Sequence, residues 1–146
     1  MRKTKAGRIL LGVTNLVFIA LIFTAVYSAI PPAYNVGISS ATVTSKPSAY
    51  VVTVSYTVTN NGFYEIDNFY VSITANDPYS NFVNSTQTVP VSIQRGYSQS
   101  GTVSLDLNLT YVSANPGNYN IVFTIHSEFA YGLIKFSVQS PQVVPL

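Results

Sequence analysis

Few side chains in this sequence could take part in acid–base or metal chemistry. The only histidine, His126, lies two residues before Glu128, and strand alternation puts both side chains on one face. A histidine–carboxylate pair can transfer protons or share a metal ion. The same alternation turns this face toward solvent, and the sequence has no second histidine to complete a site. We therefore expect His126 and Glu128 to have a structural or solvent-facing role.

Three carboxylates offer a second candidate for metal chemistry. Glu65 and Asp67 are same-face neighbours at the start of the strand predicted for residues 66–76, and Asp77 follows its end. A calcium site needs about six to eight oxygen ligands, and this spacing matches no calcium loop. The sequence also lacks cysteine, a Gly-x-Ser-x-Gly elbow and a glycine-rich phosphate loop. We predict that the protein is not an enzyme and has no catalytic residue, cofactor or metal site.

The charges are distributed unevenly along the chain. Beyond residue 30 there are three positive and five negative side chains, so this part carries 3 − 5 = −2. Binding of nucleic acid requires a basic patch that neutralises phosphates, and none is available there. The sequence therefore predicts no nucleic-acid partner. The other positive charges precede residue 9: Arg2, Lys3, Lys5 and Arg8.

Residues 9–30, ILLGVTNLVFIALIFTAVYSAI, contain no charged side chain. A helix rises about 1.5 Å per residue, and about 20 apolar residues cross a membrane. We predict one transmembrane helix in contact with membrane lipid. Lysine and arginine stay on the cytoplasmic side, so residues 1–8 should be cytoplasmic and the remaining chain extracytoplasmic. The expected location is the cell membrane, in a single pass.

Two other interpretations of the N-terminus stay open. A cleaved secretory signal has an apolar core of about 7 to 15 residues, shorter than this run. A pilin-type leader is suggested by Lys5-Ala6-Gly7, which resembles the basic-small site ahead of the hydrophobic segment in archaeal type IV pilin precursors. The length of the run favours an uncleaved anchor that keeps its leader.

Two residues in the apolar run are candidates for contact with another helix. Gly12 would let a neighbouring backbone approach closely, and the amide of Asn15 gains a hydrogen-bond partner against protein rather than lipid. We expect partners among other membrane or envelope proteins, with self-association also open.

After Pro31-Pro32, which end the helix, the hydrophobic pattern alternates with a period of two. Turns such as Asn61-Gly62 and Asn115-Pro116-Gly117-Asn118 separate the segments. We predict seven strands and an antiparallel two-sheet sandwich, with Pro90 interrupting the fourth strand. The strands are expected near residues 36–43, 49–60, 66–76, 82–93, 101–111, 119–128 and 133–138. The domains are then the linker 31–35, the sandwich 36–140 and a C-terminal tail 141–146.

The exposed face must be polar mainly through hydroxyls and amides, because only 8% of the residues are charged. Such a composition resembles cell-surface proteins, archaeal ones in particular. Two sequons begin at Asn84 and Asn108, and they fit an extracytoplasmic location. We take both asparagines as glycosylation candidates.

Three segments resemble the late-embryogenesis-abundant type 2, or water-stress and hypersensitive-response, domain: VSYTVTNNGFYEIDNFYVSI, VPVSIQRGYSQSGTVSLDLNL and NYNIVFTIHSEFAYGLIKFSV. The family's usual Asn-Pro pair is Asn60-Asn61 here. The resemblance implies an immunoglobulin-like sandwich that is non-catalytic and often tethered to a membrane. A second similarity is to archaellum accessory proteins, which join one N-terminal span to an extracellular sandwich.

These observations predict a non-catalytic, membrane-anchored sandwich that serves as a structural or accessory subunit of a membrane or cell-envelope assembly. The alternative is a pilin-like or archaellum-associated subunit of a filament, in contact with the surface layer. In that case residues 9–30 would form the core of the filament.

Overall fold

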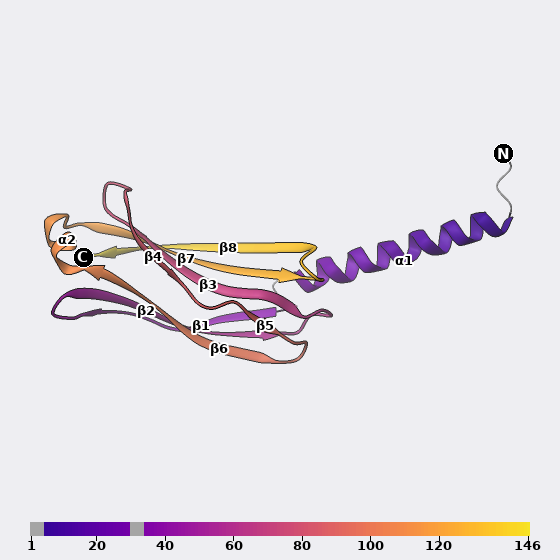
Figure 1. The fold of residues 1–146 in the computed structure, drawn as a ribbon, viewed down its shortest axis with the longest axis horizontal. Helices are drawn as coiled ribbons and strands as arrows, with labels where there is room; N and C mark the ends of the chain where they lie inside the picture. The colour runs from indigo at the N-terminus through magenta and orange to yellow at the C-terminus, as the bar shows by residue number, and fades with distance from the viewer. Residues whose placement is uncertain (1–4, 30–33) are drawn as a thin grey trace.

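The computed structural model describes residues 5–29 and 34–146, and it consists of one long helix followed by two packed β-sheets (Figure 1). The helix projects from one end of the sheets, and the C-terminus lies at the opposite end. The elements are α1 (Lys5–Ala29), β1 (Tyr34–Ser45), β2 (Ala49–Asn60), β3 (Ile66–Asn76), β4 (Phe82–Gln87), β5 (Val91–Ile93), β6 (Ser98–Asn108), α2 (Leu109–Ala114), β7 (Asn118–Phe129) and β8 (Ile134–Pro145).

The protein is mainly β, and its two antiparallel sheets pack together in an arrangement that resembles a sandwich. The first sheet has the order β1-β2-β6. The second sheet has the order β4-β3-β7-β8, and β5 pairs with β3 on the same edge as β4. Together, the strands confirm the predicted two-sheet antiparallel arrangement.

The core lies between the sheets and consists of the side chains that alternation turns inward. The strands β2, β3, β6 and β7 each contribute several buried residues, and removal of their apolar area from water is the main stabilising term. The inward faces follow the prediction: Val52, Val54, Tyr56 and Val58 on β2, Phe69, Val71 and Ile73 on β3, Val103, Leu105 and Leu107 on β6, and Tyr119, Ile121 and Phe123 on β7.

The number of strands was predicted wrongly: the described residues form eight strands, not seven. The segment 82–93 is split around Pro90 into β4 and β5, because proline has no amide hydrogen for the ladder. Both pieces pair with β3, but β4 contacts it from Ser72 to Asn76 and β5 near Ile66 and Phe69. The predicted bounds of β2 and β3 are confirmed.

A strand through residue 111 was also predicted wrongly, because β6 ends at Asn108 and the helix α2 follows. The side chain of Asn108 accepts hydrogen bonds from the amides of Thr110 (2.9 Å) and Tyr111 (3.2 Å). An asparagine in this position caps a helix and ends the strand pattern. Near the C-terminus, β8 continues beyond the predicted 133–138 and pairs with β7 as far as Pro145.

The helix α1 contains most of the predicted apolar run, while residues 30–33 lie outside the described part of the chain. Among residues 5–29 and 34–146, no helix is both long and apolar enough to cross a membrane. The transmembrane assignment of residues 9–30 therefore stays a prediction.

Candidate functional site

Two surfaces of the sandwich are candidates for a functional site. The first, which we call the junction, lies where α1 meets the loops at one end of the sheets. The second, the outer-face hollow, lies on the solvent-facing side of the second sheet.

A buried asparagine organises the loops of the junction. Asn60 is fully buried, and its side-chain nitrogen donates to the carbonyl oxygens of Tyr64 and Ile93, each at 2.9 Å. Its side-chain oxygen accepts from the amide of Gly62 at 2.9 Å. Because one side chain satisfies three backbone groups, the β2–β3 loop is held against the end of β5.

The helix contacts this end of the sandwich through the side chains of Thr24 and Tyr27. Thr24 Oγ1 and the Tyr64 hydroxyl are 2.9 Å apart, and the rings of Tyr27 and Phe63 lie 5.4 Å apart at their centroids. Phe63 also contacts Arg95, whose guanidinium lies 5.5 Å from the centre of the Phe63 ring. The β2–β3 loop therefore forms the seat of α1.

The β7–β8 turn places apolar side chains beside α1. Ala130, Tyr131 and Gly132 all have positive φ, at 52°, 59° and 79°. This tight turn presents Tyr131 and Leu133 to the outside, where they are 93% and 83% exposed. Both side chains line the same groove, so exposed apolar surface gathers at this turn.

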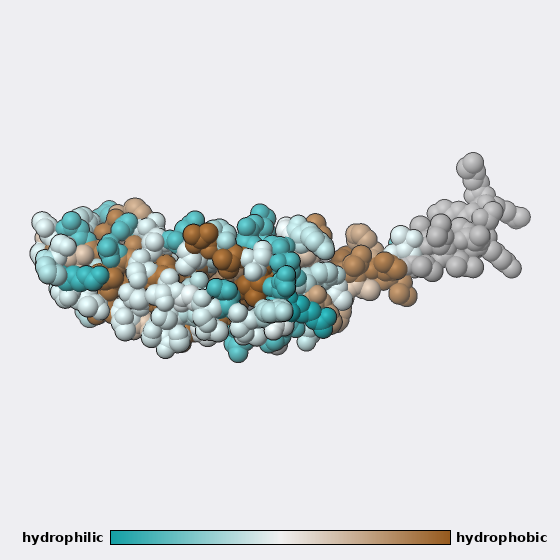
Figure 2. All heavy atoms as spheres, turned by 60° about the horizontal axis from the view of Figure 1, so that its bottom comes forward, coloured by the Kyte–Doolittle hydropathy of each residue, from teal (hydrophilic) through white to brown (hydrophobic). Residues whose placement is uncertain are grey.

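Between the turn and the helix lies an apolar groove of about 580 Å³. Figure 2 shows hydrophobic side chains gathered where α1 leaves the sandwich. The groove is lined on one side by α1 and on the other by loop and strand residues: Phe18, Leu21, Ile22, Val26, Tyr64, Ala130, Tyr131, Leu133 and Ile134.

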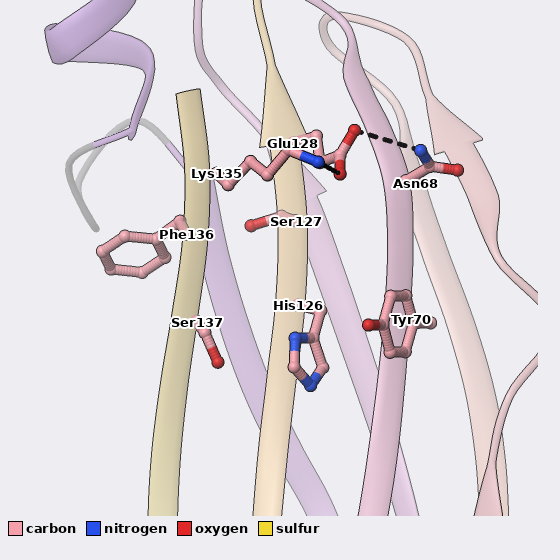
Figure 3. Close-up of a pocket in the computed structure, with 8 residues that line it drawn as sticks. All are labelled: Asn68, Tyr70, His126, Ser127, Glu128, Lys135, Phe136 and Ser137. Carbon is pink, nitrogen blue, oxygen red and sulfur yellow. Dashed lines mark hydrogen bonds and ion pairs between the residues drawn. The ribbon is translucent and has the colours of Figure 1, made fainter. Parts of the chain in front are cut away.

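The outer-face hollow has a volume of about 270 Å³ and a polar lining from β3, β7 and β8 (Figure 3). The rings of Tyr70 and His126 stack at 4.3 Å between centroids and 13° between planes. Glu128 Oε1 pairs with Lys135 Nζ at 2.9 Å, and Glu128 Oε2 accepts from Asn68 Nδ2 at 3.1 Å. Both oxygens of this carboxylate are therefore engaged.

Electrostatics in the hollow follow from this pairing. The hydrogen bond from Lys135, followed by that from Asn68, lowers the pKa of Glu128. The hydrogen bond to Glu128 raises the pKa of Lys135. Both groups thus remain charged near neutral pH, and their opposite charges cancel.

Sequence reasoning placed His126 and Glu128 on one face, and the structure has them there, half-buried rather than fully in solvent. Their partners were missed because they lie on neighbouring strands: Tyr70 is the register partner of His126, and Lys135 that of Glu128. Asn68 sits in a bulge of β3, where the register with β7 shifts. Spacing along one strand contains no signal for such cross-strand contacts.

The three carboxylates weighed above as calcium ligands, and predicted not to form a metal site, have separate surroundings. Asp77 is buried and accepts hydrogen bonds from the amides of Tyr79 (2.9 Å) and Asn81 (2.8 Å) and from the Tyr111 hydroxyl (2.9 Å). Asp77 therefore holds the β3–β4 turn against α2, while Asp67 pairs in register with Glu128 on β7 and Glu65 lies exposed before β3.

The two sequon asparagines lie near each other at the end of the sandwich opposite α1. Asn84 and Asn108 are both exposed, and both line a hollow of about 210 Å³. Asn84 Nδ2 donates to the Asp106 carbonyl at 2.8 Å, whereas Asn108 uses its side-chain oxygen to cap α2. Their glycosylation stays a prediction.

The helix-contact candidates both lie in α1. Asn15 is exposed, and the side-chain surroundings of Gly12 lie outside the described residues. Contact of either residue with a partner helix stays a prediction.

No family model and no curated protein matches the sequence. Among solved structures, the fold is similar to a protein of Bordetella pertussis assigned as ApaA, at 15% identity and a TM-score of 0.50, over 77% of this chain and 94% of that one. It is also similar to the structural-genomics target SoR45, at 13% identity and a TM-score of 0.54, over 80% and 89% of the two chains.

A β-glucuronidase of Bacteroides uniformis matches at 8% identity and a TM-score of 0.49, over 77% of this chain but only 13% of the enzyme. At these identities, the two better matches show that the chain shares a mainly β fold with known proteins, and they show the fold alone.

Proposed function

We propose that this protein is a non-catalytic, membrane-anchored β-sandwich that acts as a structural or accessory subunit of a membrane or cell-envelope assembly. The basic N-terminus would remain in the cytoplasm, residues 9–30 would lie in the membrane, and the sandwich would stand on the extracytoplasmic side. We further propose that the sandwich is immunoglobulin-like, of the late-embryogenesis-abundant type 2 kind, in an archaeal envelope.

The observation that carries this proposal is the apolar surface of α1. Residues 16–23 are all apolar, and consecutive helical residues are about 100° apart, so they cover every side of the helix. Leu16 and Phe23 are 70% and 68% exposed, and the large apolar side chains between them are at least 50% exposed. A helix that is apolar on all sides requires lipid or protein around it.

The junction supports the same orientation. Tyr27, Phe63, Tyr64 and Tyr131 surround the place where α1 reaches the sandwich. Aromatic side chains are enriched where a membrane meets water, because they have both an apolar body and a polar edge. The membrane surface would then lie at the junction, and the β7–β8 turn would touch it.

The membrane assignment is tested by placing a charge on the helix. Val17→Lys puts a lysine on α1, which costs about 2.5–3.5 kcal/mol at the centre of a membrane helix. We expect this variant to move from the alkali-resistant membrane fraction to the supernatant. The matched control is Val143→Lys, since Val17 and Val143 are 50% and 68% exposed and Val143 lies far from α1 on β8. Equal retention of both variants, or no retention of the parent protein, would contradict the membrane assignment.

The accessory-subunit role is tested in native membranes. A photo-crosslinking amino acid at Asn15 or at Tyr131 should capture one constant partner from each position. If the protein runs as a single monomer after detergent extraction and no constant partner is captured, the role in an assembly is abandoned.

The filament subunit is the second candidate, because the all-round apolar surface of α1 would also fit the core of a filament. The mass of the intact mature protein separates the two. An N-terminus at or just after Gly7 supports the filament, whereas retention of residues 1–5 contradicts it.

A further inference from the structure

The two sequons of the sandwich place their asparagine side chains in different surroundings. Asn84 and Asn108 are both exposed, and the side-chain oxygen of each accepts from a backbone amide. The sugar of an N-glycan is attached to the amide nitrogen and not to the oxygen. The contacts of the two nitrogens therefore determine which sequon can carry a glycan in the folded protein.

Asn84 lies inside β4, and both polar atoms of its side chain are engaged. Its nitrogen donates to the carbonyl oxygen of Asp106 on β6 at 2.8 Å, and its oxygen accepts from the backbone amide that follows, at 2.9 Å. The bond to Asp106 joins the two sheets. Asn84 and Thr86 are also the register partners of Ala75 and Ile73 on β3. A glycan on Asn84 would therefore have to leave from the place where β4 meets β6.

Asn108 is the last residue of β6, and only the oxygen of its side chain is engaged. That oxygen accepts from the amides of Thr110 at 2.9 Å and Tyr111 at 3.2 Å. An atom that faces two backbone N–H groups must be the amide oxygen, so the other atom is the nitrogen. Among residues 5–29 and 34–146, this nitrogen has no hydrogen-bond partner. It can therefore be substituted without loss of a described contact.

The backbone after Asn108 also suits a glycosylation acceptor. The bond from the Thr110 amide closes an Asx-turn, in which an asparagine oxygen accepts from the backbone two residues further on. This turn holds Thr110, which supplies the hydroxyl of the sequon, close to the Asn108 side chain, and Thr110 is exposed. Acceptor sequons are typical of surface loops, and this one begins where a strand ends.

We propose that Asn108 carries an N-glycan and that Asn84 does not. This rests on the proposed function, because the glycosylation machinery acts on the extracytoplasmic side. The co-reactant is a sugar joined through its anomeric carbon to a lipid phosphate. A bond forms between the Asn108 nitrogen and that carbon, and the bond from the carbon to the phosphate oxygen breaks. The nitrogen loses one proton, and the lipid phosphate leaves.

The glycan leaves the fold intact. The oxygen of Asn108 takes no part in the new bond, so it can still cap α2. Asn108 lines the hollow of about 210 Å³ together with Phe82, which is 64% exposed. The glycan would leave the sandwich beside this hollow, at the end where α2 lies, opposite α1 (Figure 1). The junction stays free for contact with membrane partners.

Mass spectrometry of the full chain, purified from the membranes of the cells that make it, tests this proposal. Cleavage after Arg95 separates the two sequons, because Asn84 precedes Arg95 and Asn108 follows it. We expect the fragment that contains Asn108 to be heavier than its sequence by a whole number of sugar residues. The fragment that contains Asn84 should carry no sugar.

Variants that keep the cap of α2 locate the sugar. Thr110→Ala removes the hydroxyl of the sequon but keeps the backbone amide that donates to Asn108, so the added mass should be lost completely. Thr110→Ser keeps a hydroxyl and should retain the added mass. Asn108→Asp keeps a capping oxygen but has no amide nitrogen, so it should also lose the sugar. The matched control is Thr86→Ala in the other sequon, which should leave the added mass unchanged.

Three outcomes would overturn the proposal: a sugar on the fragment that contains Asn84, no sugar on the fragment that contains Asn108, or added mass retained in Thr110→Ala. Protease added to the outside of intact cells separates the two causes of a missing sugar. If the sandwich is digested and Asn108 is bare, the glycosylation proposal fails while the extracytoplasmic orientation stands. If the sandwich is protected and Asn108 is bare, the proposed orientation fails as well.

Discussion

At the scale of single residues, Asp77 joins two parts of the chain that are distant in sequence. Its carboxylate accepts hydrogen bonds from Asn81 and Tyr79 in the β3–β4 turn and from the Tyr111 hydroxyl in α2. Burial alone would raise the pKa of Asp77, but the hydrogen bonds from Asn81, Tyr111 and Tyr79 outweigh burial and leave the pKa below its usual value of 3.8. The ionised form therefore stabilises the fold.

This shift predicts how stability depends on pH. Because the pKa is lower in the folded state, the contribution of Asp77 is present above the unfolded-state pKa of about 3.8 and is lost as pH falls through the folded value. We expect the thermal midpoint of the parent protein to fall more steeply below pH 4 than that of Asp77→Asn, in melts followed by circular dichroism. As a control, Asp106→Asn changes an exposed carboxylate on β6. A parallel pH profile for Asp77→Asn and the parent would contradict the assignment.

The failures of prediction from sequence can also be traced to single residues. Residues 109–111 continue the apolar–polar alternation of β6, and the capping side chain of Asn108 marks the start of a helix. Likewise, Ser127 lies on the core face of β7, and spacing along one strand does not reveal that its register partner in β8 is Phe136. The alternation within a strand predicts which face of the sheet a residue lies on, but not which residue of the neighbouring strand it contacts.

At the scale of elements, β2 and β6 approach each other around a glycine. Gly101 is the register partner of Tyr56, whose ring is buried and packs 5.9 Å from that of Phe69. A Cβ added at Gly101 would lie 2.5 Å from the Tyr56 hydroxyl and 2.7 Å from its Cζ. The aromatic ring thus covers the glycine, an arrangement known to stabilise glycine in sheets.

Gly101→Ala should therefore destabilise the sandwich by about 1–3 kcal/mol, because the packed Tyr56 ring has to move. Gly37→Ala is the matched control in β1, since a Cβ there meets only the Thr57 carbonyl oxygen at 4.0 Å. We expect it to be neutral or slightly stabilising in chemical denaturation. Equal effects of the two substitutions would show that loss of glycine, and not the Tyr56 contact, determines the cost.

Elements were the scale at which the sequence was most informative. The bounds of β2 and β3 follow from alternation bounded by turn residues, as at Asn61-Gly62. The sequence predicted that Pro90 interrupts the strand. Whether Pro90 bends one strand or separates two depends on β3, which pairs with β4 and β5 along different parts of its length. Pairing with β3, and not the local preference of the sequence, therefore determines that residues 82–93 form two strands.

At the scale of the whole molecule, the contacts at the junction determine how α1 stands on the sandwich. The described interactions are the hydrogen bond between Thr24 and Tyr64, at 2.9 Å, and the contact of Tyr27 with Phe63. A hydrogen bond contributes about 0.5–1.5 kcal/mol and an aromatic pair a similar amount. Together they can favour one orientation of the helix by roughly tenfold or more.

The orientation is measurable because the sequence contains no cysteine, so two labels can be introduced without background. Leu16→Cys on α1 and Val143→Cys near the end of β8 are both at exposed positions. Electron–electron distance measurement between spin labels should give one narrow distribution. Adding Tyr64→Phe and Phe63→Ala together should broaden it, because both contacts are lost. Adding Tyr97→Phe, a similar change at an exposed tyrosine that α1 does not contact in the described interactions, should leave it narrow. A distribution already broad in the parent would mean that the junction does not hold the helix, and the proposed position of the β7–β8 turn at the membrane surface would lose its basis.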